Sequence, residues 1–102
     1  MSEGPELPGE AVAGQARVEV VLRNKYGLHA RPATLIAQTA KPFASSIKLE
    51  KDGQVVDAKS IFGMLTLAAE SGSKLVVSAE GADAAEAVAR LADVIQGFDV
   101  DD

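Results

Sequence analysis

The sequence contains no cysteine, which excludes disulfide bonds and metal sites built from thiolates. Its single histidine, His29, is too little for a zinc or iron site, because such sites need three or four protein ligands. No apolar run approaches the roughly 18 residues that a membrane-spanning helix requires. We therefore expect no metal, no other cofactor and no membrane insertion.

Basic residues are also scarce, with 10 Lys and Arg against 15 Asp and Glu, for a formal net charge of −5. They are scattered along the chain, whereas nucleic acids and anionic lipids bind clusters of positive charge. We predict neither kind of partner. The first residues lack the positive start and apolar core of a secretory signal, so we expect a cytoplasmic protein.

Composition divides the 102 residues into three parts. Residues 1–16 are acidic and rich in Pro and Gly, a composition that buries too little apolar surface to offset the entropy of ordering. They are predicted to form a flexible extension. Residues 17–98 carry the patterned segments of one small domain, and residues 99–102 form an acidic tail.

The apolar residues of the domain follow two periods. Alternation predicts strands at about 17–23, 47–50, 55–56 and 75–79. Helical spacing predicts helices at about 32–40, 61–68 and 84–95. Asp52-Gly53 is typical of a hairpin turn, Ser60 of a helix N-cap, and Asp83 with Glu86 of a capping box.

These elements follow the order strand, helix, strand, strand, helix, strand, helix (βαββαβα). Strands with one apolar face and helices with one apolar stripe favour an α+β fold. We predict a two-layer open-faced sandwich, in which a four-stranded antiparallel sheet carries the helices on one face and meets water on the other.

The most informative residue is His29, which immediately precedes the first predicted helix. Main-chain N–H groups at a helix start lack partners and, with the helix dipole, attract anions. Arg31 adds a planar cation suited to phosphate oxygens, and Gly27 allows close approach of a partner. A neutral imidazole can attack a phosphoryl group. Because residues 27–33 contain no group that would activate water, the pattern favours a phosphoryl carrier over a hydrolase.

A lone histidine before a helix is more often a cap or a solvent-facing residue. The residues alone therefore leave two interpretations open, a carrier that uses His29 and an interaction module in which His29 is idle.

Longer stretches resemble a known family. Residues 27–33, Gly-Leu-His-Ala-Arg-Pro-Ala, resemble the active-site signature of HPr, the histidine-containing phosphocarrier of the phosphoenolpyruvate-dependent phosphotransferase system. Residues 59–65, Lys-Ser-Ile-Phe-Gly-Met-Leu, resemble the family's second signature, and residues 78–81 the end of its fourth strand. The family shares the βαββαβα order, and the resemblance covers about residues 17–98.

The resemblance implies that His29 accepts a phosphoryl group on Nδ1 from enzyme I and passes it to IIA-type acceptor proteins. Arg31 would assist the transfer, while Gly27, Ala30 and Pro32 would form the turn and helix start that stabilise the phosphate. Such a protein is a carrier rather than a stand-alone enzyme, and we expect a monomer.

The second signature implies control and docking. Ser60 matches the serine that an HPr kinase/phosphorylase modifies in many relatives, where a phosphate would suit the helix dipole and repel an acidic partner. Ile61, Phe62 and Met64 match positions that meet enzyme I and the acceptors. Ile61 and Met64 also have the spacing of a core stripe, whereas Phe62 falls off that stripe.

Two alternatives stay open. Residues 97–102 resemble the ending of nitrogen-related paralogues, whose phosphate flow serves regulation rather than sugar import. The segment after Ser60 instead resembles HPr of bacteria that have the kinase. An interaction module is the other alternative, although relatives of that kind typically lose the histidine that this chain keeps. We expect a largely exposed His29 ring, so that a His29→Ala change abolishes transfer without unfolding the domain.

Overall fold

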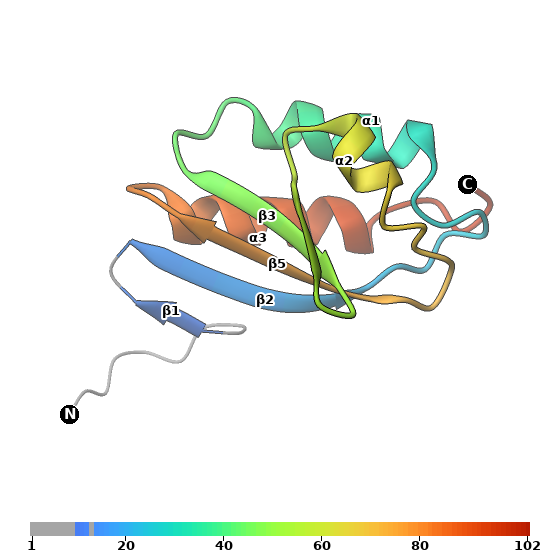
Figure 1. The fold of residues 1–102 in the computed structure, drawn as a ribbon, viewed down its shortest axis with the longest axis horizontal. Coiled ribbons are helices and arrows are strands. Elements are labelled where there is room, and N and C mark those ends of the chain that lie inside the picture. Colours follow the sequence, from blue (N-terminus) through green and yellow to red (C-terminus); the bar gives the residue numbers. More distant parts are fainter. Residues whose placement is uncertain (1–9, 13) are drawn as a thin grey trace.

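The computed structural model describes residues 10–12 and 14–102 (Figure 1). The elements follow in the order β1 (Glu10–Val12), β2 (Gln15–Val21), α1 (Ala30–Ala40), β3 (Ser46–Lys51), β4 (Gln54–Asp57), α2 (Ile61–Leu65), β5 (Lys74–Glu80) and α3 (Ala84–Gln96).

The strands form one antiparallel sheet in the order β1-β2-β5-β3-β4. The central strand β5 pairs Val77 with Val18 of β2 on one side and with Leu49 of β3 on the other. The helices lie together on one side of the sheet (Figure 1). The α+β class and the antiparallel open-faced sheet are confirmed.

The core fills the space between the two layers, as the apolar patterns predict. From the helices it receives Ala33, Ile36, Ala37 and Ala40 of α1, Met64 of α2, and Ala84, Val88, Leu91 and Ile95 of α3. From the sheet it receives Val20, Ile47, Leu49, Leu75 and Val77, each at most 2% exposed. Packing of apolar stripes against one apolar sheet face supplies the main stabilisation of such a domain.

The start of the domain differs from the expected boundary. Strand β2 begins at Gln15, and β1 pairs its backbone with β2 so that Glu10 lies opposite Arg17. Gly14, at φ +77, closes the turn between them. A strand of three residues is too short to show a period, so composition alone assigned it to a flexible extension. The expected flexibility of residues 1–9 lies outside the described residues.

The start of α3 also corrects an expectation. Asp83 occupies the N-cap position, but its side chain does not cap the helix. Its carboxylate instead accepts hydrogen bonds from the main-chain N–H groups of Ala44 and Ser45, at 2.9 and 3.0 Å, and from the Ser45 hydroxyl. Asp83 therefore ties the α1–β3 connection to the β5–α3 connection, at the end of the molecule away from the C-terminus (Figure 1).

No helix in the described part of the chain is long and apolar enough to cross a membrane. Residues 10–12 and 14–102 also contain no group of three His, Asp or Glu side chains placed to hold a metal ion.

Candidate functional site

The chain enters α1 through a turn that requires glycine. Gly27 has φ +67, and a Cβ atom at this position would collide with the main-chain oxygen of Ala69. Asn24, which is completely buried, donates from Nδ2 to the Gly27 oxygen at 2.6 Å. Next in the chain, buried Leu28 donates its N–H to the same Ala69 oxygen at 2.9 Å. The turn is thereby fixed on both sides just before the histidine.

His29 is the N-cap residue of α1, with extended backbone angles, and its side chain does not cap the helix. Among the described residues, nothing accepts a hydrogen bond from the main-chain N–H of Ala30 or Arg31. Pro32 has no N–H and is buried within the first turn. The start of α1 therefore offers two N–H donors for which the described residues supply no acceptor.

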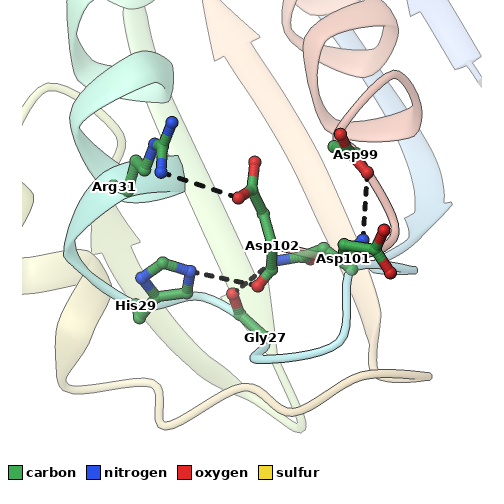
Figure 2. Close-up of polar contacts among 7 residues, drawn as sticks. Gly27, His29, Arg31, Asp99, Asp101 and Asp102 are labelled. Carbon is green, nitrogen blue, oxygen red and sulfur yellow. Dashed lines mark hydrogen bonds and ion pairs between the residues drawn. The ribbon is translucent and has the colours of Figure 1, made fainter.

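The His29 ring is half-buried, rather than largely exposed as the sequence suggested. Its Nε2 lies 3.2 Å from the main-chain oxygen of Asp102 (Figure 2). The Tyr26 ring stands edge-on to it, with centroids 6.1 Å apart and planes at 85°. A main-chain oxygen only accepts hydrogen bonds, so Nε2 carries the proton of this contact. In a neutral ring, Nδ1 is then the nitrogen with the free lone pair.

The Arg31 side chain also reaches Asp102, the residue that the His29 ring contacts, and it is 74% exposed. Its Nη1 lies 3.7 Å from Oδ1 of Asp102, whose side chain is 40% exposed (Figure 2). An exposed pair at this distance is weak, because water screens the charges and holding two side chains costs entropy. The guanidinium can therefore exchange its partner at little cost.

The acidic tail, residues 99–102, is part of the site. Lys25 donates its N–H to the Val100 oxygen at 2.8 Å, and Tyr26 donates to the Asp102 oxygen at 3.0 Å. Within the tail, the Asp102 N–H reaches the Asp99 oxygen at 3.0 Å. These bonds hold the end of the described chain against the loop that leads to His29.

Ser60 stands at the start of α2, where the sequence places it. Its hydroxyl oxygen accepts a hydrogen bond from the Gly63 N–H at 3.0 Å, so Ser60 is the N-cap of this helix. A Cβ atom on Gly63 would lie 3.2 Å from that same oxygen, a tight contact. The glycine inside α2 therefore leaves room for the cap.

The three residues predicted for docking lie in different surroundings. Phe62 is 83% exposed, more than any other large apolar side chain of the described residues. Ile61 is half-buried and packs against the core. Met64 is completely buried, which corrects the expectation that it meets a partner, because its place on the apolar stripe of α2 turns it inward.

A family model described as "PTS HPr component phosphorylation site" matches residues 16–97. This chain belongs to the HPr family. Proteins of the HPr family are phosphocarriers and not stand-alone enzymes, so the predicted family and class are confirmed.

Individual relatives agree with the HPr assignment. The HPr-like protein Crh of Bacillus subtilis is 48% identical over 82 residues, which cover 80% of this chain and 94% of Crh. The phosphocarrier protein HPr of Borreliella burgdorferi is 41% identical over 80 residues, covering 78% and 93%. The crystal structure of HPr from Bacillus anthracis superposes with a TM-score of 0.76 at 44% identity, covering 80% of this chain and 98% of that one.

The structure of one HPr relative concerns the oligomeric state. The crystal structure of Crh, 47% identical over 76% of this chain and 88% of that chain with a TM-score of 0.66, is a dimer with a swapping domain. A monomer therefore stays a prediction for the present chain.

Three residues at the site were not predicted from the sequence. Asn24 has a local signal, because Asn commonly bonds to the backbone of its own turn, but that signal does not show burial. Tyr26 and Asp102 have none, because their contacts with His29 depend on where the tertiary fold brings the tail.

Proposed function

We propose that this HPr-family chain carries a phosphoryl group on Nδ1 of His29, received from phosphorylated enzyme I and passed to IIA-type acceptor proteins in the cytoplasm. The observation that carries the proposal is the hydrogen bond from Nε2 to the Asp102 oxygen. This bond leaves the Nδ1 lone pair free, on the residue that directly precedes the unused donors of α1.

The transfer needs no further group on this chain. The Nδ1 lone pair forms a bond to phosphorus while the bond from phosphorus to the donor breaks and leaves its electron pair on the donor. The N–H groups of Ala30 and Arg31 are suited to the phosphoryl oxygens, since a helix start favours negative charge. Onward transfer reverses these roles, with His29 as the leaving group.

Arg31 would stabilise the charge on the phosphoryl group during both transfers. Its guanidinium is largely exposed and bound only weakly, so it can turn to the phosphoryl oxygens. Hydrogen bonds between guanidinium and phosphate are charge-assisted and can be bidentate. A lysine at this position would keep the charge and lose that geometry.

We also propose that α2 carries docking and control. Phe62 offers an exposed apolar side chain for enzyme I and the acceptors, with the exposed part of Ile61 beside it. Ser60, at the start of the same helix, is the candidate substrate of an HPr kinase/phosphorylase. A phosphate on its hydroxyl would place about two negative charges next to Phe62 and weaken binding of an acidic partner.

The test is incubation with enzyme I, Mg²⁺ and labelled phosphoenolpyruvate, followed by treatment of the product with acid or base. Label that survives base and is lost in acid would identify a phosphohistidine, which must be His29 because the chain has one histidine. The His29→Gln chain, with a side chain of similar polarity, is the matched control and should stay unlabelled. Absence of label, with the enzyme I active on another carrier, would favour the interaction module.

The branch is tested in the same assay. Transfer of label from His29 to IIA proteins for sugars supports the sugar branch, and transfer only to a nitrogen-related IIA protein supports the regulatory paralogues.

A further inference from the structure

We propose that Asn24 is a positioning residue for phosphoryl transfer, which holds His29 in place through the main-chain oxygen of Gly27. This inference rests on the proposed function of His29. It assigns a role to a residue of the β2–α1 connection that lies outside the signature of residues 27–33. Asn24 is completely buried, so it acts on the site from inside the domain and cannot touch a docked partner.

The oxygen of Gly27, which lies beside His29 in Figure 2, joins Asn24 to the histidine. It accepts hydrogen bonds from Nδ2 of Asn24 at 2.6 Å and from the N–H of His29 at 3.0 Å. The N–H of Gly27 donates to the main-chain oxygen of Asn24 at 3.1 Å, so Asn24 binds both polar groups of this glycine. Because a glycine backbone turns easily, the side-chain bond fixes the direction of the carbonyl that holds the His29 N–H.

Asn24 itself is attached to a fixed strand end. Leu22, two residues earlier, is completely buried, and its N–H donates to the Ser73 oxygen at 2.9 Å. The Leu22 oxygen accepts a hydrogen bond from the N–H of Gly72 at 2.6 Å. The Asn24 amide therefore extends the constraint of the sheet to the turn at Gly27.

The other end of the amide indicates that stability alone does not account for Asn24. Its Oδ1 is buried and accepts no hydrogen bond from the described residues. An unpaired buried acceptor costs free energy, and rotating the amide would set Oδ1 against the Gly27 oxygen, where neither atom can donate. An apolar side chain of similar shape would avoid this cost but lose the donor. The amide is accounted for by the direction that its donor gives to the Gly27 carbonyl.

Without this donor the turn would still close, but it would hold His29 less firmly. The N–H of Gly27 keeps its main-chain acceptor, and Leu28 keeps its bond to the Ala69 oxygen. The Gly27 carbonyl, however, is then free to tilt, and the His29 backbone moves with it relative to the start of α1. Because transfer depends on the direction of Nδ1 toward phosphorus, kcat should fall. KM should not change, because Asn24 is not on the surface where partners dock.

The experiment measures kcat and KM for phosphorylation of the Asn24→Leu and Asn24→Ala chains by phosphorylated enzyme I. Both chains lack the donor, but leucine fills the space of the amide and alanine leaves a gap, so their stabilities should differ. We expect kcat to fall by about two- to tenfold in both, the equivalent of one hydrogen bond, with KM unchanged. An unchanged kcat, a change confined to KM, or losses that follow the stabilities of the two variants would overturn the positioning role.

Ser45→Ala is the matched control. Asn24 and Ser45 are the two buried polar residues in the described part of the chain, and the Ser45 hydroxyl also donates one hydrogen bond, to Asp83. Ser45 lies at the other end of the molecule from His29, so its replacement should lower stability and leave kcat unchanged. All chains are assayed well below their unfolding temperatures. If Asn24→Leu does not fold, Asn24→Ala is compared with Ser45→Ala, and equal kcat values would overturn the proposal.

The amide NMR spectrum of the unphosphorylated chain supplies a second readout, which reports the path through Gly27. The His29 N–H signal should shift in both Asn24 variants, because its acceptor oxygen changes direction. The Gly63 N–H signal should stay in place, because its acceptor is the Ser60 hydroxyl. A His29 signal that does not move would show that the Gly27 carbonyl is held without Asn24, which contradicts the proposal.

The two proposals fail in different ways. If the wild-type chain takes no label, the proposed function fails and the inference falls with it. If the wild-type chain and both Asn24 variants are labelled on His29 with the same kcat, the carrier function stands and only the role of Asn24 is refuted.

Discussion

The helices α1 and α2 differ in the residue that stands at the N-cap. At α2, the Ser60 hydroxyl caps the helix by accepting a hydrogen bond from the N–H of Gly63, the third helical residue. At α1, His29 occupies the same position without capping, and the third helical residue, Pro32, has no N–H that a cap could accept. The difference shows where the chain forgoes local stabilisation, since a Ser, Asp or Asn cap contributes about 1 kcal/mol.

Replacement of His29 by a capping residue gives the largest expected effect and tests this comparison directly. His29→Ser should abolish phosphohistidine formation. Its hydroxyl can bond to the free N–H of Arg31, so this variant should be about 1 kcal/mol more stable than His29→Ala. Urea unfolding and the labelling assay measure the two effects. Equal stability of the two variants would show that the α1 start is already satisfied.

The turn before α1 should be more sensitive than an ordinary glycine turn. Gly27→Ala meets both a positive φ and the Ala69 oxygen, so we expect a loss of about 3 kcal/mol in the free energy of unfolding. Gly53→Ala is the matched control. Gly53 has φ +86, but nothing lies within 4 Å of its added Cβ, so the loss should be about 1 kcal/mol. Similar losses in both variants would mean that the contact with Ala69 contributes nothing.

Removal of the α2 cap should have a moderate effect on stability and none on phosphoryl transfer to His29. Ser60→Ala should lower the free energy of unfolding by about 1 kcal/mol. Ser46→Ala, at an exposed serine on β3, is the control and should stay within about 0.5 kcal/mol of wild type. A loss of labelling in the Ser60→Ala chain would show that α2 acts on His29 as well as on partners.

Asp83 stands at the start of the third helix, α3, and is predicted to make the stability of the domain depend on pH. We expect this effect to be the smallest of the four, because the carboxylate is partly exposed. Hydrogen bonds from the Ser45 hydroxyl and then the Ala44 N–H hold the pKa of this carboxyl below its usual value of 3.8. A folded-state pKa below the unfolded one adds stability above the unfolded pKa, and this stability is lost as the pH falls through the folded pKa.

Asp83→Asn should therefore be less stable than wild type at neutral pH, and the difference should shrink below about pH 4. Thermal unfolding between pH 2.5 and 7 measures it. A difference that stays constant with pH would attribute the effect of Asp83 to packing rather than to its charge.

Period and turn chemistry were enough to predict most of the fold. The hairpin at Asp52-Gly53 and the end of α3 before Gly97 lie where the sequence indicated them. The failed prediction at Asp83 depends on a contact between distant segments. Asp83 has the spacing of a capping residue, yet its partners are almost forty residues earlier in the chain. The helix predicted at about 61–68 ends at Leu65, and Ala68 adopts φ +50 with no glycine to indicate it.

In the candidate site, too, residues with a local pattern were predicted, and a residue that depends on a distant contact was not. His29, Arg31 and Ser60 were found because each has a local signature and a position at a helix start. Met64 was assigned to a partner by resemblance, although its place on the apolar stripe already indicated burial. Asp102 was set aside as tail, because no local pattern shows that a segment more than seventy residues away will return to the histidine.

The strand order has a consequence for how fast the chain folds. Strand β2 leads directly into the His29 turn, yet its central partner is β5, with Val20 opposite Leu75 in the register. A ladder that joins residues so distant in sequence raises the contact order and slows folding. The chain loses the entropy of closing that long loop before the hydrogen bonds and side-chain contacts of the ladder can stabilise it. A fragment that stops short of β5 would therefore have the whole signature around His29 and still lack the sheet on which its turn is built.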